Sequence, residues 1–224
     1  MIFKRLRGLN TQAPLTVPFP ELEPLRAYTM CVGAALRNLH TQARKVAVEG
    51  ILGDIVECGV CNGGSAASIA LGFGDQRRLL WLYDSFEGLP EPKEVDGSEA
   101  VQWSGKCVGS VEKVYDALAI ARVDPDRIRL QKGWFEETFR GPLPEHIAFL
   151  HIDADWYDSV LLSLETFYDR VAEGGVIVLD DFGYWRGCRE AFRDFFAKRT
   201  VVPVLENSGG DSQRHWIKGR SRTD

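Results

Sequence analysis

Short runs of apolar residues, separated by stretches of helical character, constrain the fold of this chain more than any other feature of its sequence. The runs are mainly apolar, which is typical of strands covered on both faces in a parallel sheet. We expect five such strands, at residues 54–58, 79–84, 128–131, 147–153 and 176–180.

The stretches between the strands have the 3.6-residue periodicity of amphipathic helices. Residues 21–50 form the first helical stretch, with Val32 on its apolar stripe. The clearest stretch covers residues 159–173, and Gly174 and Gly175 are expected to end it. This alternation of strands and helices predicts an α/β fold with a doubly wound sheet and right-handed crossovers.

The length of 224 residues suits one α/β domain better than two. We expect an irregular N-terminal arm over residues 1–20, followed by a single domain over residues 21–224. Residues 87–106 are polar and interrupted by glycine and proline, and they are long for a connection within a domain. That segment is therefore predicted to be a lid or binding loop.

Composition and charge exclude several classes of protein. The net charge of -5 disfavours general nucleic-acid binding, which requires a basic face. We find neither a signal peptide nor an apolar run near the roughly 18 residues of a membrane span, and we expect a cytoplasmic protein without membrane partners. Five scattered cysteines suit a reducing compartment, and Cys58 and Cys61 are interpreted as packing and loop residues rather than as a redox or zinc pair.

Acidic residues stand at the ends of four of the predicted strands. They are Glu57, Asp84, Asp153 and Asp180, the last followed directly by Asp181. In an open α/β sheet, ligands bind outside the carboxyl ends of the strands, so these acids stand where function is expected. The alternative is that they cap the following helices.

A glycine-rich turn over residues 57–65 follows the first strand. Glycines there let the backbone approach a ligand, and the next helix offers free N–H groups. Cys61 stands where a dinucleotide fingerprint has its second glycine, which disfavours a nicotinamide site. Together with Asp84 at the end of the next strand, the turn indicates an adenosine-containing ligand.

Two acidic segments, HIDADWY at residues 151–157 and LDDFG at residues 179–183, follow strands that should be neighbours. Carboxylates gathered about 4 Å apart repel one another by about 1 kcal/mol in water and about 4 kcal/mol at an effective dielectric of 20. A cation between them would relieve that repulsion, and oxygen ligands favour Mg²⁺, Mn²⁺ or Ca²⁺. Ordinary capping and solvent exposure are the alternative, and His151 is interpreted as an interior strand residue rather than a ligand.

With these segments the chain resembles the macrocin O-methyltransferase-like (TylF/MycF) family, whose members methylate sugar hydroxyls of natural products. The similarity extends from about residue 28 to residue 216 and is carried by VECGVCNGGSA, LYDSFEGLPEP, KCVGSVEKV, HIDADWYDS and VIVLDDFGYWRGCREAF. It implies a class I methyltransferase fold, with a seven-stranded, mostly parallel, Rossmann-like sheet in a single domain.

The resemblance also implies a binding site for S-adenosylmethionine (SAM). Its residues would be Glu57 and Gly59 at the methionine end, Ser65 at the helix start, Asp84 at the ribose, Ser85 and Phe86 beside the adenosine, and Tyr28 and Met30 closing over it.

The family further implies that Asp153, Asp180 and Asp181 bind Mg²⁺ (or Mn²⁺) and that Asp155 is the general base. Coordination by a metal would lower the pKa of the acceptor hydroxyl and fix its direction. Asp155 would then accept the proton. An unperturbed aspartate, with a pKa near 3.9, is a weak base for an alcohol, so the metal is assigned the larger share.

The function expected from these features is SAM- and divalent-metal-dependent O-methylation of a sugar or another small natural-product intermediate. The acceptor would be a glycosylated or sugar-like small molecule, and a homo-oligomer stays open. One alternative is another hydroxyl acceptor, either a catechol or phenol or the FkbM-like range. A catechol enzyme should have a lysine near its metal acids, and residues 155–157 offer none. The other alternative is a SAM-binding protein without catalysis.

Overall fold

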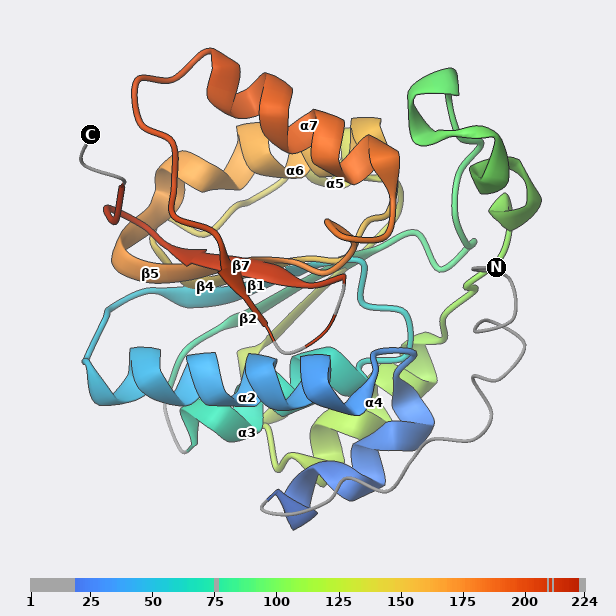
Figure 1. Cartoon of the computed structure of the whole chain (residues 1–224). Helices are drawn as coiled ribbons and strands as arrows, with labels where there is room; N and C mark the ends of the chain where they lie inside the picture. The colour runs from blue at the N-terminus through green and yellow to red at the C-terminus, as the bar shows by residue number, and fades with distance from the viewer. Residues whose placement is uncertain (1–18, 75–76, 209, 211, 222–224) are drawn as a thin grey trace.

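A seven-stranded sheet divides the molecule into two helical layers in the computed structural model, which describes residues 19–74, 77–208, 210 and 212–221 (Figure 1). Nearly all of the predicted arm over residues 1–20 therefore lies outside the described residues. The strands are β1 (Asp54–Cys58), β2 (Leu80–Asp84), β3 (Ile128–Lys132), β4 (Ile147–Ile152), β5 (Val171–Leu179), β6 (Glu206–Asn207) and β7 (Arg214–Ile217).

The strand order β3-β2-β1-β4-β5-β7-β6 confirms the predicted doubly wound α/β sheet. The first five strands of this order are parallel to one another, and β7 and β6 add an antiparallel edge. The chain builds outward from β1 to β3, and then returns to β4 on the other side of β1. The carboxyl ends of β1 and β4 therefore form the switch point at which open α/β sheets bind ligands.

Helices cover both faces of the sheet. One layer contains the 3₁₀ helix η1 (Pro20–Tyr28) with α2 (Gly33–Val48), α3 (Gly64–Phe73) and α4 (Val111–Ile120), and the other contains α5 (Phe135–Thr138), α6 (Tyr157–Phe167) and α7 (Arg186–Ala197) (Figure 1). Two further 3₁₀ turns are η4 (Pro125–Arg127) and η5 (Tyr168–Arg170). No helix in the described ranges has both the length and the apolarity required to span a membrane.

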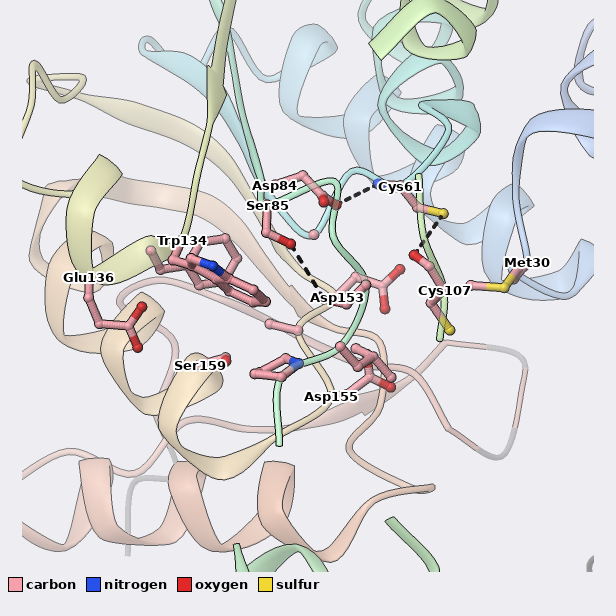
Figure 2. A pocket seen from close by; sticks show the side chains of 16 residues that line it. Met30, Cys61, Asp84, Ser85, Cys107, Trp134, Glu136, Asp153, Asp155 and Ser159 are labelled. Atoms are coloured by element: carbon pink, nitrogen blue, oxygen red, sulfur yellow. Dashed lines mark hydrogen bonds between the residues drawn. The ribbon is translucent and has the colours of Figure 1, made fainter. Parts of the chain in front are cut away.

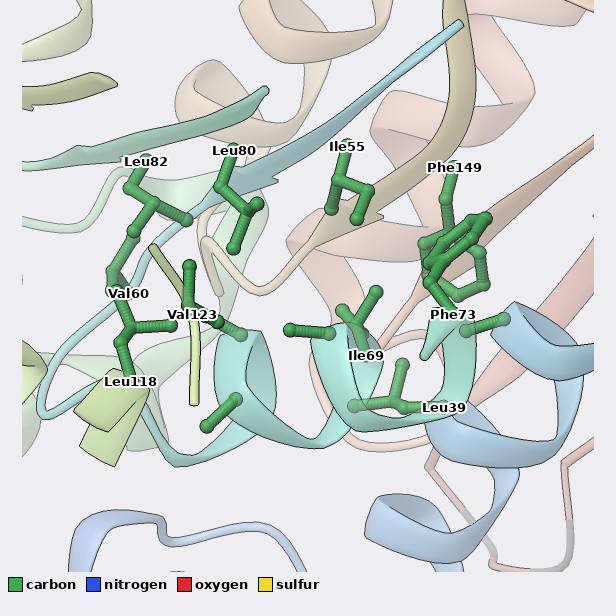
Figure 3. Close-up of a cluster of buried hydrophobic side chains, with 14 of the residues drawn as sticks. Leu39, Ile55, Val60, Ile69, Phe73, Leu80, Leu82, Leu118, Val123 and Phe149 are labelled. Atoms are coloured by element: carbon green, nitrogen blue, oxygen red, sulfur yellow. The ribbon is translucent and has the colours of Figure 1, made fainter. Parts of the chain in front are cut away.

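Successive strand residues point into different halves of the core, because side chains alternate across a sheet. Ile55 and Phe149 pack with the α2–α4 layer, as Figure 3 shows. Their neighbours Val56 and Leu150 pack with the α6–α7 layer. Burial on both sides explains why these strands are apolar at almost every position.

The single helical stretch predicted for residues 21–50 is wrong, because η1 ends at Tyr28 and α2 begins only at Gly33. Thr29 is extended, and the backbone there crosses the start of α3. A Cβ atom on Gly64 would lie 2.7 Å from both the Tyr28 carbonyl oxygen and the Thr29 Cβ. This crossing breaks the helical periodicity, and Val32 is 51% exposed instead of lying on the apolar stripe.

The predicted end of the helix at residues 159–173 is also wrong. Helix α6 ends at Phe167, and β5 begins at Val171 and runs through Gly174 and Gly175. Val171 pairs with Ile147 of β4, and the register shifts before the next pair. Gly174 has φ +82°, so it accommodates this irregularity in the strand. Pairing in the sheet has overridden the local helical pattern.

The segment predicted as a lid, residues 87–106, contains the 3₁₀ turns η2 (Glu94–Asp96) and η3 (Ser98–Trp103). Its anchor is the buried Asp96, which accepts a 2.7 Å hydrogen bond from the backbone N–H of Tyr157 at the start of α6. The indole N–H of Trp156 donates to the Pro90 carbonyl at 2.9 Å. These contacts hold the segment beside the carboxyl end of β4.

Candidate active site

A cavity lies at the carboxyl ends of the parallel strands, next to the switch point (Figure 2). The loops that follow β1, β2 and β4 form much of its wall, and they contribute Gly59, Cys61, Asp84, Ser85, Asp153 and Asp155. The cavity therefore brings together the glycine turn and the acids that the sequence placed at the strand ends.

Gly59 allows the loops after β1 and β4 to touch. Its φ is +90°, and a Cβ atom at this position would lie 1.8 Å from the Asp153 carbonyl oxygen. The Asp153 N–H also donates to the Cys58 carbonyl at 2.9 Å. A side chain at Gly59 would thus push away the loop that carries Asp153, so the glycine is required by backbone packing as well as by any ligand.

Asp84 closes the glycine turn from the neighbouring strand. Its carboxylate accepts hydrogen bonds from the backbone N–H groups of Cys61, at 2.8 Å, and Phe86, at 2.6 Å. Cys61 and Phe86 have φ values of 49° and 59°, in the left-handed region. Asp84 therefore stabilises two sharp bends while it lines the cavity together with Ser85.

The eight residues predicted to bind the cofactor divide into two groups. Four of them line the cavity, namely Met30, Gly59, Asp84 and Ser85. The other four are not among the residues that line it, namely Tyr28, Glu57, Ser65 and Phe86. In this second group, Phe86 packs into the core of the α2–α4 layer, and Ser65 is buried in the first turn of α3.

Glu57 lies on β1, beneath the cavity floor, and pairs with His151 of β4. Both side chains are fully buried, and the His151 Nδ1 lies 2.8 Å from the Glu57 Oε1. Among the described residues, the Glu57 Oε2 and the His151 Nε2 have no hydrogen-bond partner, and the Asp180 Oδ1 lies 3.6 Å from the His151 Nε2. Burial disfavours the imidazolium, but the carboxylates of Asp180 and Glu57 outweigh this effect and raise the pKa of His151 to about 9. His151 is an interior strand residue, as predicted, and it links Glu57 to the acids above.

Four aspartates gather at the ends of β4 and β5. Oxygens of Asp153, Asp155 and Asp181 lie within 4.8 Å of one another. Asp153 also belongs to a second group within the same distance limit, with Asp180 and the thiol of Cys31. The three predicted metal ligands are therefore divided between two groups that share Asp153, and Asp155 rather than Asp180 lies with Asp153 and Asp181.

Crowding and burial shift the proton equilibria of these acids. Burial, and next the charge of Asp180, raise the pKa of Asp153 well above its usual value. Burial, followed by the charge of Asp155, does the same for Asp181. Burial raises the pKa of Asp155 to about 7, although a hydrogen bond from Trp185 acts in the opposite direction. Such a group favours either protons or a bound cation.

The structure adds residues to the site that the sequence did not single out. Trp134, Phe135 and Glu136 follow β3 and line the cavity. Figure 2 shows Trp134 and Glu136 on the side of the cavity opposite Cys61 of the glycine turn. Their only signal in the sequence was their position after a strand. Cys31 and Gln213 contact Asp180, with the Gln213 amide donating to its Oδ1 at 2.6 Å. These two residues come from opposite ends of the chain, and nothing in the sequence indicated that they would contact Asp180.

Comparisons with known proteins agree with this geometry. A family model described as macrocin O-methyltransferase (TylF) matches residues 19–210. The tetracenomycin-related 8-demethyl-8-(2,3-dimethoxy-alpha-L-rhamnosyl)-tetracenomycin-C 4'-O-methyltransferase of Streptomyces olivaceus is 32% identical over 83% of this chain and 74% of its own length. The mycinamicin III 3''-O-methyltransferase of Micromonospora griseorubida is 28% identical over 77% of this chain and 71% of its own length.

A solved structure has a similar fold. The O-methyltransferase NovP superimposes with a TM-score of 0.77 at 25% identity, covering 86% of this chain and 83% of that protein. The sheet order and the cavity at its carboxyl edge are those of a class I methyltransferase. The chain therefore belongs to the macrocin O-methyltransferase (TylF) family and is a SAM-dependent O-methyltransferase.

Proposed function

We propose that this enzyme transfers the methyl group of SAM to a hydroxyl of a sugar carried by a small natural product, with the help of a divalent cation. The observation that carries the proposal is a group of four aspartates beside a cavity, two of which, Asp153 and Asp155, line it together with Asp84 and Gly59. The side of the cavity with Asp84 and Gly59 suits an adenosine-containing methyl donor. The group of aspartates suits a hard cation next to the acceptor.

The cofactor would extend from the glycine turn to the loop after β3. Asp84 is positioned to accept hydrogen bonds from ribose hydroxyls, with Ser85 and Met30 along the same wall. The planar side chains of Trp134 and Phe135 suit the adenine ring. Tyr28, Ser65 and Phe86 were predicted to contact the cofactor, and because they do not line the cavity we propose that they support this wall from behind.

The methionine end of the cofactor would lie over Gly59. The Glu57 Oε2 is buried there with no hydrogen-bond partner in the described part of the chain, and a buried carboxylate oxygen favours a nearby positive charge. The ammonium group of SAM is a suitable cation. SAM supplies a methyl group that is already electrophilic, because it is bound to a positively charged sulfur.

Asp153, Asp180 and Asp181 would hold the cation, and Mg²⁺ or Mn²⁺ fits a site made of carboxylates. The mutual repulsion that raises the pKa values of Asp153 and Asp181 supports this assignment, because a divalent ion would remove it. A cation held there supplies Lewis acidity, which lowers the pKa of an alcohol.

Asp155 would act as the general base. It lines the cavity, and its pKa of about 7 makes it a stronger base than an ordinary aspartate. Proximity would supply much of the remaining rate enhancement.

The acceptor class is inferred from the relatives. The name of the Streptomyces olivaceus enzyme specifies a rhamnosyl substrate, and the Micromonospora griseorubida enzyme is named for methylating mycinamicin III. A glycosylated natural product is therefore the proposed acceptor. A cytoplasmic location accords with the five cysteines, which are all free thiols.

The proposal is tested by calorimetry and by methyl transfer. Purified protein should bind SAM but not NADH, and it should methylate rhamnosyl glycosides in the presence of Mg²⁺ and lose this activity with a chelator. Products are identified by mass spectrometry, with catechol as the competing acceptor. Binding of NADH alone would refute the proposal, and efficient methylation of catechol alone would refute the acceptor class.

Metal binding is tested separately with a matched pair of variants. Asp180→Asn should weaken Mn²⁺ binding, measured by electron paramagnetic resonance, by at least about tenfold. Asp169→Asn is the control, because Asp169 is 74% exposed and pairs with Arg199 far from the cavity. Equal Mn²⁺ binding by both variants would remove Asp180 from the ligand set.

A further inference from the structure

The carboxylate of Asp155 is held by a buried tryptophan. The indole N–H of Trp185 donates a 2.7 Å hydrogen bond to the Asp155 Oδ1. Trp185 is only 4% exposed and lies directly before α7, where its backbone N–H donates to the Asp181 carbonyl at 2.9 Å. One residue therefore contacts both acidic segments of the site.

Other rings fix the orientation of the Trp185 side chain. Trp156 packs against it edge to face with ring centroids 4.8 Å apart, and Tyr184 packs at 4.6 Å. Trp103, from the segment predicted as a lid, approaches at 6.2 Å. A ring enclosed in this way has one direction for its N–H group, and that direction points at Asp155.

The backbone of Asp155 also restricts where its carboxylate can lie. Asp155 has φ +53°, a conformation that non-glycine residues rarely adopt, in a tight turn where the Trp156 N–H donates to the Ala154 carbonyl at 2.6 Å. Its own N–H donates to the Asp181 carboxylate at 3.3 Å. With the main chain bent in this way, the hydrogen bond from Trp185 fixes the remaining torsions of the side chain.

The chemistry of the donor matters as much as its position. A carboxylate has two oxygens, and the bond from Trp185 occupies Oδ1, which leaves Oδ2 for another partner. An indole N–H is uncharged, so it orients the carboxylate without forming a salt bridge. An arginine or lysine in its place would neutralise the negative charge that a base requires.

We propose that Trp185 is a positioning residue for methyl transfer, which holds Asp155 so that its second oxygen faces the acceptor hydroxyl. This inference rests on the proposed role of Asp155 as the base. Because small displacements of a reacting group slow a reaction strongly, the loss of this one bond should slow the chemical step and leave substrate binding intact.

The test compares two tryptophans that make the same kind of bond at opposite edges of the sheet. Trp185→Phe keeps an aromatic ring but removes the N–H, and we expect the single-turnover rate to fall by about 10- to 100-fold with the KM values changed by less than about twofold. Trp81→Phe is the control, since the Trp81 indole donates to the Asp54 Oδ2 at 3.0 Å, remote from the cavity. Its rate should equal that of the wild type.

A double-mutant cycle separates positioning from general packing. In an Asp155→Asn background, Trp185→Phe should slow the remaining reaction by less than about twofold, because the group that Trp185 positions has been replaced. If Trp185→Phe does not fold, 3-benzothienylalanine at position 185 replaces the N–H with sulfur and keeps the shape of the ring.

Each outcome decides between the two proposals. A normal single-turnover rate in the Trp185 variants, or an equal rate loss with and without Asp155, would overturn the positioning role and leave the proposed base in place. A normal rate in Asp155→Asn alone would instead refute the base, and the role of Trp185 with it.

Discussion

The two edges of the parallel sheet use the same pair of residue types in different ways. At the amino edge, Asp54 accepts hydrogen bonds from the Leu79 N–H at 3.1 Å and from the Trp81 indole at 3.0 Å. At the carboxyl edge, Asp155 also accepts a bond from an indole, that of Trp185. Asp54 has one donor for each carboxylate oxygen, however, whereas Asp155 shares its surroundings with three other aspartates.

An acid at a strand end is therefore not in itself a sign of function. At the amino edge, donors match the acceptors, and the aspartate ties two strands together. At the carboxyl edge, carboxylates crowd together, and burial raises several of their pKa values. An unmatched group of this kind stabilises the fold only when protons or a cation bind to it.

Asp155→Asn should change the activity more than any other substitution considered for the two edges. Removing the base should lower the single-turnover rate by about 10²–10⁴-fold, while calorimetry should give an unchanged affinity for SAM. Asparagine has the shape of aspartate and keeps an oxygen for the Trp185 indole, so the fold should be retained. The same substitution at Asp54 is the matched control, and a comparable rate loss there would erase the distinction between the two edges.

A second pair of variants tests Gly53 and Gly59, which flank β1 and lie against β4 and the loop that follows it. Gly59→Ala places a methyl group against the Asp153 carbonyl, and we expect a loss of at least about 3 kcal/mol in the free energy of unfolding together with loss of SAM binding. At the amino edge a Cβ on Gly53 would lie 2.7 Å from the Ala148 N.

Gly53→Ala should therefore destabilise the protein by about 2 kcal/mol but preserve the affinity for SAM. Thermal denaturation and calorimetry measure the two quantities. Wild-type SAM affinity in a folded Gly59→Ala variant would show that the turn does not need its glycine for binding.

The third prediction concerns pH. Burial raises the pKa of Asp155 to about 7, above its unfolded value, so its share of stability is present at low pH and is lost as the pH rises through 7. His151 has the same effect. The carboxylates of Asp180 and Glu57 raise its pKa to about 9, so its contribution to the stability of the fold is lost as the pH rises from about 6.5 through 9.

With a chelator present, the midpoint of thermal unfolding should therefore fall by about 4–8 °C between pH 6 and pH 9, which corresponds to about 2 kcal/mol. Mg²⁺ should remove most of this fall. Asp153→Asn should flatten the pH profile, and Asp54→Asn should leave its slope unchanged. A chelator-treated protein that is equally stable at both pH values would contradict the crowding of charges.

The smallest effect is expected for the stability of Asp54→Asn. The amide retains one acceptor but places an NH₂ group against one of the two donors, so about 1–2 kcal/mol of stability should be lost. Urea denaturation measures this loss, and the kinetic constants should not change. A large loss of activity would mean that the amino edge influences the site.

Much of the fold could be predicted because buried strands are apolar at nearly every position. Strand β1 has the predicted limits, and β2, β3 and β4 differ from prediction by one residue at one end. The prediction failed where contacts distant in sequence decided the outcome. Val171 has helical spacing with the residues before it, but it pairs with Ile147 in the sheet.

The site was predictable in part for the same reason. Asp84, Asp153 and Asp180 directly follow or end strands, and parallel strands bring their carboxyl ends to one edge. Which side chains would meet those acids was not predictable. Cys31 and Asp180 are 149 positions apart in the chain, and the crossing of η1 over α3 brings them together.

Hydrophobic periodicity and the direction of parallel strands are local properties, so the sequence was enough to predict the five parallel strands in chain order and the edge at which the acids would gather. The hydrogen-bond donors that each acid meets, by contrast, depend on contacts made only in the folded chain. Hydrogen bonds act over about 3 Å, so Trp185 could be assigned to Asp155, and Trp81 to Asp54, only once the chain had folded.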